Sequence, residues 1–277
     1  IRNRGRFFLV SLVIALITLL VLFIAALGEG LANGNRQYIA NLDAQLIVFL
    51  EKSDFIIPSS RLETNTARTV RRVDGVADAG PIYTSSTEIV SLEEPLKVSM
   101  LGVEPGRPGM PEIIEGREFR GGEAREAVID KNVALRSDIK VGDEIEIRST
   151  QGTDDQFFTL EVVGLVDGQS YAFQPTIFVP VTTWEKIRPQ SEADLNSDIP
   201  YPNIIAVKLQ EPGQIELVKA RLLANVPNIE VADLATTINN VPGYSAQQGT
   251  VQTQGFFTLL IGVLVIGGFF QIQILQK

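Results

Sequence analysis

The sequence predicts an α+β protein in which two transmembrane helices flank an extracytoplasmic domain. Two apolar runs, residues 7–27 and 255–275, contain no charged side chain. Each run has about the 20 residues that a helix needs to cross the hydrocarbon core of a bilayer. All 33 acidic residues lie between the runs, in a segment that alternates between helical and extended patterns. Residues 28–254 are therefore expected to fold as a domain outside the membrane.

Basic residues at the two ends of the chain predict its orientation. Beyond the outer ends of the two runs, the basic residues are Arg2, Arg4, Arg6 and Lys277. Because basic residues are enriched on the cytoplasmic side of membrane spans, we expect residues 1–6 to be a cytoplasmic flank of a multi-pass cell (inner) membrane protein. A cleaved signal peptide is the alternative for the first run, although its apolar region would have only about 7–15 residues. The chain begins with Ile and stops two residues after the second run, so we expect a fragment of a longer polypeptide.

The composition excludes several classes of function. The segment between the runs contains 20 of the 24 basic residues and all 33 acidic ones, and its net charge of −13 disfavours nucleic-acid binding. The absence of Cys and His excludes disulfides, thiol catalysis, Ser–His–Asp triads and zinc sites built from these residues. No Gly-x4-Gly-Lys-Ser/Thr loop is present to bind ATP phosphates. We therefore predict no catalytic, cofactor-binding or metal-binding residue in this chain.

The first strand–helix–strand unit is expected within residues 46–95. Residues 46–50 are typical of a buried strand. Ser60 and Glu63 have the spacing of a capping box, which predicts that a helix begins there. Residues 76–90 are expected to be extended, with an interruption at Gly80–Pro81.

A second unit of the same kind is expected within residues 203–233. It has a strand at 203–209, a helix opened by Glu211-Pro212-Gly213 and a strand at 229–231. The junctions Val73-Asp74-Gly75-Val76 and Val226-Pro227-Asn228-Ile229 match weakly, as in an internal repeat. We expect the two units to pack side by side as one α+β subdomain near the membrane.

Residues 96–180 are expected to form a small β-rich subdomain inserted into the first. Short extended segments, among them 126–134, and Gly/Pro turns follow one another there with little helix, as in a small sandwich or barrel. Residues 28–45 are expected to continue the first helix as a stalk or to leave it through a Gly-rich break. The uncharged residues 234–254 are expected to form a second stalk, which leads to the second span.

Several individual residues have two interpretations. Trp184 is expected to pack where a strand turns into a short helix, with a ligand anchor as the alternative. The acidic pairs Glu93-Glu94 and Asp154-Asp155 are expected to be solvated turn residues. In the second run, Thr258 and Gly262 have small-xxx-small spacing and Gly267 and Gly268 follow, which predicts a close contact between helices in lipid.

The layout resembles a known family. The residues that carry the resemblance are the N-terminal segment RNRGRFFLVSLVIALITLLVLFIAALGEGL, the strand AQLIVFLEK, the stretch ALRSDIKVGDEIEI…FFTLEVVGLV and the Gly-rich run that ends QILQK. This combination resembles the MacB/FtsX-type permease subunits of ABC transporters, including their DevC/LolC-like branch. The resemblance covers the N-terminal part of such a permease, with its first two transmembrane helices and its extracytoplasmic domain.

The resemblance implies a function without catalysis in this chain. It implies a permease homodimer or heterodimer in membrane lipid, a cytoplasmic ABC ATPase subunit that binds ATP and Mg, and a periplasmic adaptor protein as a further partner. ATP hydrolysis in the partner would then move the extracytoplasmic domain, in export or mechanotransmission. The alternative is a transmembrane ligand sensor of the chemoreceptor or receptor-kinase type, which also places a domain between two spans. The substrate does not follow from the residues.

Overall fold

A computed structural model describes residues 4–92, 94–191, 200–240, 249, 253, 255–257, 259–263 and 267 of the chain. The chain divides into two compact units, residues 34–242 and residues 1–33 with 243–277. The predicted second span at 255–275 and residues 241–254 of the predicted stalk lie largely outside the described residues. Within the described part of the chain, no helix meets the length and hydropathy that a membrane crossing requires.

The first helix runs much further than the first apolar run. Helix α1 extends over Arg4–Ala40 without a break, although the segment after the run contains Gly28, Gly30 and Gly34. Of the two alternatives for residues 28–45, the continuous helix is therefore the one observed. The helix reaches into the unit at 34–242, where Tyr38 and Ile39 are buried.

The first part of the domain is a split β-α-β arrangement. Its elements are β1 (Leu46–Leu50), α2 (Thr66–Val70), β2 (Val76–Ile89), β9 (Ile204–Leu209), α5 (Ile215–Asn225) and β10 (Ile229–Asp233). The strands lie in the order β10-β1-β9-β2, and each neighbouring pair is antiparallel. Because β9 inserts between β1 and β2, the two units share one sheet. Strands from the two predicted strand–helix–strand units thus lie side by side in this sheet.

The second part of the domain is a closed ring of strands. Its further elements are β3 (Leu96–Val103), β5 (Glu126–Asp130), β6 (Glu144–Gln151), β7 (Asp154–Val166) and β8 (Thr176–Pro180). The pairing runs β2-β3-β8-β5-β7-β6 and returns to β2, where Ile89 pairs with Ile147. The short strand β4 (Glu115–Gly116) extends the sheet beyond β7. A small barrel, one of the two predicted alternatives, is thus the observed arrangement for these strands.

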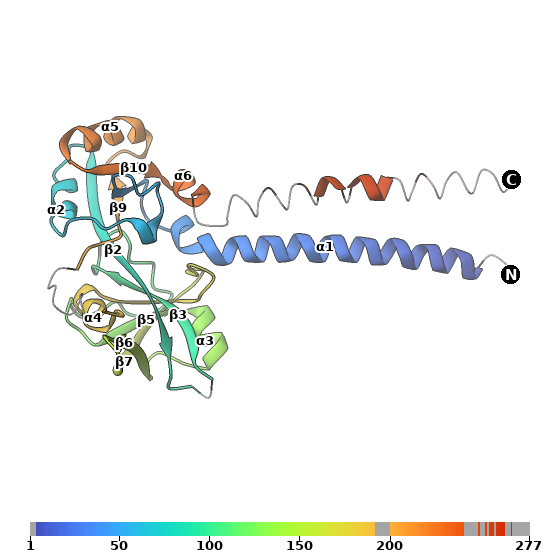
Figure 1. Ribbon diagram of the computed structural model, residues 1–277, viewed down its shortest axis with the longest axis horizontal. Helices are drawn as coiled ribbons and strands as arrows, with labels where there is room; N and C mark the ends of the chain where they lie inside the picture. Colours follow the sequence, from blue (N-terminus) through green and yellow to red (C-terminus); the bar gives the residue numbers. More distant parts are fainter. Residues whose placement is uncertain are drawn as a thin grey trace. The chain divides into compact units, whose positions relative to one another are not determined.

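Strand β2 belongs to both parts of the sheet, as Figure 1 shows. Its first half pairs with β9, and its second half pairs with β3 along its whole length. Consequently the hydrogen-bonded sheet is continuous across residue 96, where the insertion was expected to begin. The remaining helices are short: η1 (Ile57–Ser59), α3 (Lys131–Ser137), α4 (Val181–Ile187), η3 (Pro212–Gln214) and α6 (Leu234–Asn239).

Three apolar clusters fill the domain. One lies under α2 and α5 and includes Val70, Val218 and Leu222. A second fills the ring with residues such as Ile129, Ile147 and Trp184. The third combines the end of α1 with residues from both parts of the sheet, among them Phe49, Ile82, Leu101, Val128 and Phe178. The third cluster therefore joins α1 to the whole domain.

The helix expected from the Ser60–Glu63 capping box does not begin there. Residues 57–59 form a turn of 3-10 helix, and α2 begins only at Thr66. The Ser60 hydroxyl accepts a hydrogen bond from the backbone amide of Leu50, at 2.9 Å. The hydroxyl that was expected to cap a helix thus satisfies an amide at the end of a strand.

Three further expectations need correction. Gly80–Pro81 does not interrupt β2, because both residues stay in register with β9 and the missing side chain of Gly80 admits the carbonyl of Pro108. Only the first half of the expected extended segment 126–134 is a strand, because the Asp130 carboxylate caps helix α3. Residues 234–239 of the predicted stalk form α6, which packs on the core through Leu234 and Ile238.

Trp184 lies in α4 directly after β8, as predicted, and is buried. A Cβ at Gly102 would lie 2.7 Å from the Trp184 side chain. We predict that Gly102→Ala displaces the indole and lowers the free energy of unfolding by about 1–3 kcal/mol, as overpacked cores do. The chain has one Trp, so its fluorescence emission and a thermal melt report both effects. Gly213→Ala, where a Cβ would have open space, is the matched control; equal melting points for the two variants would contradict the prediction.

Candidate coupling junction between helix α1 and the domain

The last turn of α1 is anchored in the core by one aromatic side chain. Tyr38 is 2% exposed, and its ring packs on Phe178 at 5.5 Å and edge-on to Tyr171 at 6.4 Å between centroids. Its hydroxyl donates a hydrogen bond of 2.8 Å to the carbonyl oxygen of Gly109. Burial raises the pKa of this hydroxyl well above its ordinary value, so it remains a donor at any physiological pH. We call Tyr38 and its contacts the junction.

A loop of the ring holds the backbone of the same turn. The amide of Tyr38 donates to the carbonyl oxygen of Ser170 at 3.2 Å, although an amide in a helix normally bonds within the helix. The side-chain amide of Asn41 donates to the carbonyl oxygen of Gly168 at 2.7 Å. Together these bonds fix the end of α1 to residues 168–170.

The loop is in turn held by a buried carboxylate. Asp130 is fully buried at the end of β5 and caps α3 by accepting from the Asn132 amide. Its Oδ2 accepts from the Asn132 side chain at 3.1 Å and from the Ser170 hydroxyl at 3.3 Å. Burial raises the pKa of Asp130, and the hydrogen bonds from Asn132, Ser170 and the Gln169 amide oppose this shift without cancelling it. The carboxylate therefore connects the loop under α1 to the strand and helix behind it.

The next residues of this loop form a strained turn. Tyr171 and Gln174 exchange backbone hydrogen bonds of 3.0 Å, and both residues between them, Ala172 and Phe173, have left-handed backbone conformations. A turn with two left-handed central residues normally carries Asn and Gly, because a Cβ is disfavoured there. The Ser99 hydroxyl stabilises the turn by donating to the Tyr171 carbonyl oxygen at 2.9 Å. The neighbouring strand thus keeps the Tyr171 ring in place against Tyr38.

The acceptor of the Tyr38 hydroxyl lies on a segment that straps the other part of the sheet. Arg107 forms an ion pair with Asp78 at 2.7 Å, and Glu104 forms one with Arg71 at 2.6 Å. These pairs tie residues 104–107 to β2 and to the end of α2. Gly109 lies two residues further along the chain, and we call residues 104–109 the strap. Tyr38 therefore contacts both the strap and the ring, so a displacement of α1 acts on both parts of the domain.

No catalytic, cofactor or metal residue was predicted, and the described residues contain no cluster of acidic side chains that could hold a metal ion. Asp154 and Asp155 lie exposed in β7, where the Asp155 carboxylate accepts from Thr150. Glu94 is described, whereas Glu93 lies outside the described residues. In the second run, a Cβ at Gly262 or Gly267 would meet open space, so the predicted helix contact remains a prediction.

The junction was not predicted from the sequence. Tyr38, Ile39 and Leu42 are apolar residues at helical spacing within the otherwise polar segment 28–45. That spacing could have predicted a helix end that docks into a core. Asp130 carried no comparable signal, because its partners Ser170 and Gln169 are distant in sequence and their proximity depends on the fold.

A family model and a named relative both match this chain. The family model of the MacB-like periplasmic core domain matches residues 7–225. A Staphylococcus haemolyticus (strain JCSC1435) protein that carries the name putative hemin transport system permease protein HrtB is 19% identical over 280 residues, covering 99% of this chain and 70% of that protein.

Two transporter domains are among the solved structures that match the chain. One is the extracellular domain of the noncanonic ABC-type transporter YknZ from Gram-positive bacteria, at 14% identity, with 68% of this chain and 99% of that chain covered and a TM-score of 0.49. Another is the periplasmic region of MacB from Actinobacillus actinomycetemcomitans, at 16% identity, 75% and 97% coverage and a TM-score of 0.48.

We predict that Tyr38 contributes to stability mainly through its ring. Tyr38→Ala should lower the free energy of unfolding by about 3–5 kcal/mol, because it leaves a large cavity in the shared cluster. Tyr38→Phe should cost about 1 kcal/mol, because the Gly109 carbonyl loses its donor. Thermal and denaturant unfolding of the detergent-solubilised chain measure both. Tyr201→Ala, at a side chain that is 45% exposed, is the control and should change stability by less than about 0.5 kcal/mol. A Tyr38→Ala variant as stable as this control would contradict the assigned role.

We predict a pH-dependent effect of Asp130→Asn. The folded-state pKa of Asp130 is raised, so the folded protein binds this proton more tightly than the unfolded chain, whose Asp pKa is about 3.9. The unsubstituted protein therefore gains stability as the pH falls through the folded-state pKa of Asp130, and the Asp130→Asn variant lacks this gain. Asn also caps helices well, and both donors to Oδ2, a side-chain amide and a hydroxyl, can reverse to accept. The variant should be the more stable protein at pH 7, with an advantage that shrinks towards pH 4.

Melting temperatures at pH 7, 5.5 and 4.5 measure this difference. Asp130→Ala removes the helix cap and leaves the buried hydrogen-bond donors without an acceptor, so it should destabilise the protein by about 1–3 kcal/mol at every pH. Asp167→Asn, in the same loop with a side chain that is 58% exposed, is the charge-matched control. If the stability advantage of Asp130→Asn instead grew as the pH falls, the assigned direction of the Asp130 pKa shift would be wrong.

Proposed function

Since the chain belongs to the family of MacB-like periplasmic core domains, within the MacB/FtsX-type ABC permeases, we propose that it couples ATP hydrolysis in a partner subunit to movement of its extracytoplasmic domain. The observation that carries this proposal is the course of α1. One uninterrupted helix leads from the uncharged run into the core of the domain, where Tyr38 fixes its end. A continuous helix would transmit a displacement to the domain, whereas a flexible linker would absorb it.

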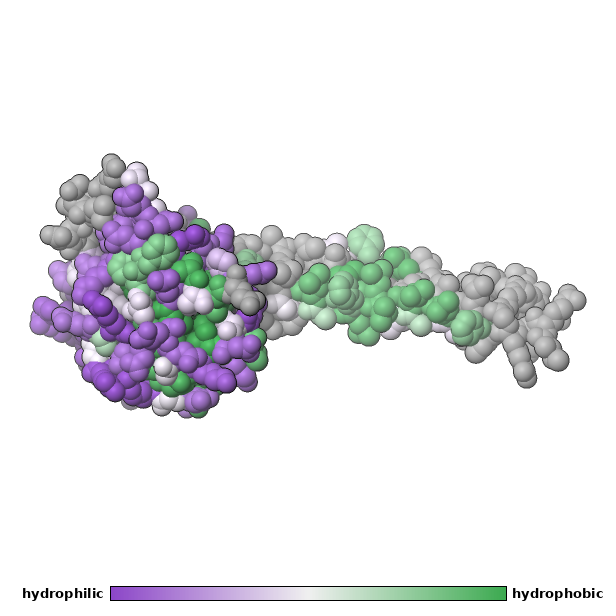
Figure 2. All heavy atoms as spheres, turned by 90° about the horizontal axis from the view of Figure 1, so that it is seen from below, coloured by the Kyte–Doolittle hydropathy of each residue, from purple (hydrophilic) through white to green (hydrophobic). Residues whose placement is uncertain are grey.

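The proposal places residues 7–27 and 255–275 in the membrane, with residues 1–6 in the cytoplasm. The uncharged composition of both runs and the arginines before the first run support this orientation. Exposed apolar side chains support it further: in the first run these are Phe8, Leu12, Leu16, Leu19, Leu20, Leu22, Phe23 and Leu27. In the second they are Phe256, Phe257, Leu259, Leu260, Ile261 and Val263. Figure 2 displays such side chains as a green surface, in contrast to the largely hydrophilic surface of the domain. Apolar surface of this extent requires lipid or another apolar partner.

The proposal also assigns partners. The sequence has no P-loop, so ATP and Mg would bind to a cytoplasmic ATPase subunit. Two permease subunits would form the membrane part, as a homodimer or heterodimer, and a periplasmic adaptor would act on the outer domain. The name of HrtB suggests hemin as the first substrate to test. Family membership favours this function over the transmembrane sensor, for which no feature of the described residues argues.

The segment of α1 between the run and the junction is the mechanical link. Residues 28–37 remain helical despite their glycines, so the link is about 15 Å long at 1.5 Å per residue. At its end, hydrogen bonds from Tyr38 and Asn41 connect it to the ring and to the strap. A rotation or shift of the span would therefore act on both parts of the domain.

We predict that a break in this link uncouples the complex. Gly30→Pro should kink or break the helix, at a cost of about 3 kcal/mol, while the junction and the domain stay folded. Gly30→Ala is the matched control, because a Cβ at this position meets nothing within 4 Å and Ala favours the helix. The expected result is that ATP-driven movement of the domain is lost in the Pro variant and preserved in the Ala variant.

The movement can be measured without knowing the substrate. The chain has no Cys, so Leu135→Cys, at a side chain that is 72% exposed, gives one spin label per permease subunit. Distances between labels are compared with and without ATP and Mg in the reconstituted complex with its ATPase. If the protein with the unmodified link gave the same label-to-label distances with and without ATP, the proposed coupling would be contradicted. An ATP-driven distance change of full size in the Gly30→Pro variant would contradict it as well.

A further inference from the structure

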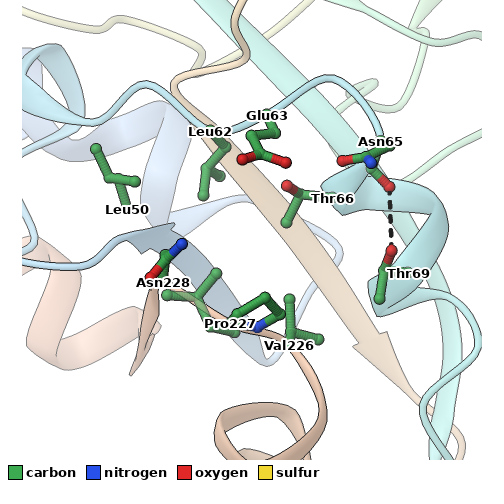
Figure 3. A pocket seen from close by; sticks show the side chains of 10 residues that line it. Leu50, Leu62, Glu63, Asn65, Thr66, Thr69, Val226, Pro227 and Asn228 are labelled. Carbon is green, nitrogen blue, oxygen red and sulfur yellow. Dashed lines mark hydrogen bonds between the residues drawn. The ribbon is translucent and has the colours of Figure 1, made fainter.

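A small cavity lies at the end of β1 and shares no residue with the junction. It has a volume of about 150 Å³ and opens between the segment that leads into α2 and the turn that joins α5 to β10. Leu50, Leu62 and Val226 form its apolar side, and Glu63, Asn65 and Asn228 provide polar groups. Figure 3 shows these side chains converging on the cavity from three elements of the chain.

The wall of the cavity is held in an unusual backbone conformation. Asn228 is left-handed, with φ of 57°, and its carbonyl oxygen accepts from the Glu51 amide at 3.0 Å. The adjoining loop contains three more left-handed residues other than Gly, namely Lys52, Asp54 and Phe55. Strained residues persist only where the surrounding structure fixes them, and they cluster at binding sites. The cavity is therefore preformed.

One carboxylate fixes that loop. Glu230 accepts a hydrogen bond from the Ser53 hydroxyl at 2.7 Å and another from the Phe55 amide at 3.0 Å through the same oxygen. These bonds join the loop after β1 to β10, whose preceding turn carries Asn228. The end of β1 and the turn with Asn228 are thus held together on one side of the cavity.

The charge at the mouth of the cavity is unpaired. Glu63 is exposed, and no hydrogen bond or ion pair of its carboxylate occurs among the residues that the structure describes. Figure 3 shows this carboxylate on the polar side of the cavity, next to the hydroxyl of Thr66. An apolar floor beside a free carboxylate selects a group that combines an aliphatic chain with a positive charge.

The size of the cavity decides between classes of ligand. Sites for small molecules have volumes of about 300–1,000 Å³, so this cavity is too small for a cofactor or a drug-sized substrate. It is large enough for one aliphatic side chain, and single anchors buried in pockets dominate the affinity of many protein interfaces. We propose that the cavity binds a partner polypeptide through one leucine-like side chain flanked by lysine or arginine. The proposal does not depend on the proposed transport function.

A photo-reactive peptide tests the assignment on the full chain in detergent. The probe is acetyl-Lys-photoleucine-Lys-amide, and mass spectrometry locates its crosslinks after irradiation. We expect crosslinks within residues 50–69 and 226–229. Unlabelled acetyl-Lys-Leu-Lys-amide should compete with the probe for the cavity. The Ala analogue should need at least about a tenfold higher concentration for the same competition, because it buries less apolar area. For acetyl-Glu-Leu-Glu-amide, the concentration needed should be about threefold higher.

A charge-reversed variant and a matched control complete the test. Glu63→Lys changes an exposed side chain and should reverse the order of the basic and acidic competitors. Glu216→Lys, at another exposed acidic residue, should leave the order unchanged. Crosslinks spread over the surface, an Ala peptide that competes as well as the Leu peptide, or an unchanged order in Glu63→Lys would each overturn the proposal. Competition by isopentylamine at the concentration of the peptide would instead assign the cavity to a small amine, and would also overturn it.

Discussion

The architecture of the domain depends on the double pairing of β2. This strand has 14 residues, and it pairs with β9 in its first half, with β3 in its second half and with β6 at its end. The partners of β2 change at Ile82, which pairs with both β9 and β3. One unbroken strand, rather than a loop, therefore joins the split β-α-β part to the ring. The third apolar cluster adds a second connection, because it contains residues from both parts.

The central stretch of β2 is also where α1 and the strap meet the sheet. Gly80 gives the strap room to approach β2, and Ile82 lies in the cluster that buries Tyr38. The ion pairs from Arg71 and Arg107 are partly exposed, and such pairs contribute little each, typically below about 1 kcal/mol. The buried ring of Tyr38 contributes more, because an aromatic side chain in a core stabilises by several kcal/mol. The anchoring of α1 is thus mainly apolar, with hydrogen bonds that determine its orientation.

Sequence pattern correctly predicted the elements that depend only on residues close together in the sequence. The strand at 204–209, the helix with Val218 and Leu222 on its buried face and the strand that begins at Ile229 all follow from period and turn residues. The start of α2 failed because Ser60 bonds to Leu50, a partner from another element. The pairing of β6 with β2 and the contacts of Asp130 lie beyond local pattern for the same reason: they join residues that are about 60 and 40 positions apart. The junction therefore could be located only partly, through the spacing of Tyr38, Ile39 and Leu42.

The link and the junction differ in stability, and this difference determines which of them would be disrupted first under load. A helical segment of about ten residues is marginal by itself, and three glycines lower its stability by about 1 kcal/mol each relative to Ala. Its helical state is consequently maintained from its ends, one of which is the junction. Loss of the helix in the link would cost less free energy than removal of Tyr38 from the core, since the apolar anchor is worth more than the few hydrogen bonds of the link. In the proposed function, the link must therefore carry a displacement at loads below those that unwind it. An unwound link would absorb the displacement instead of passing it to the domain.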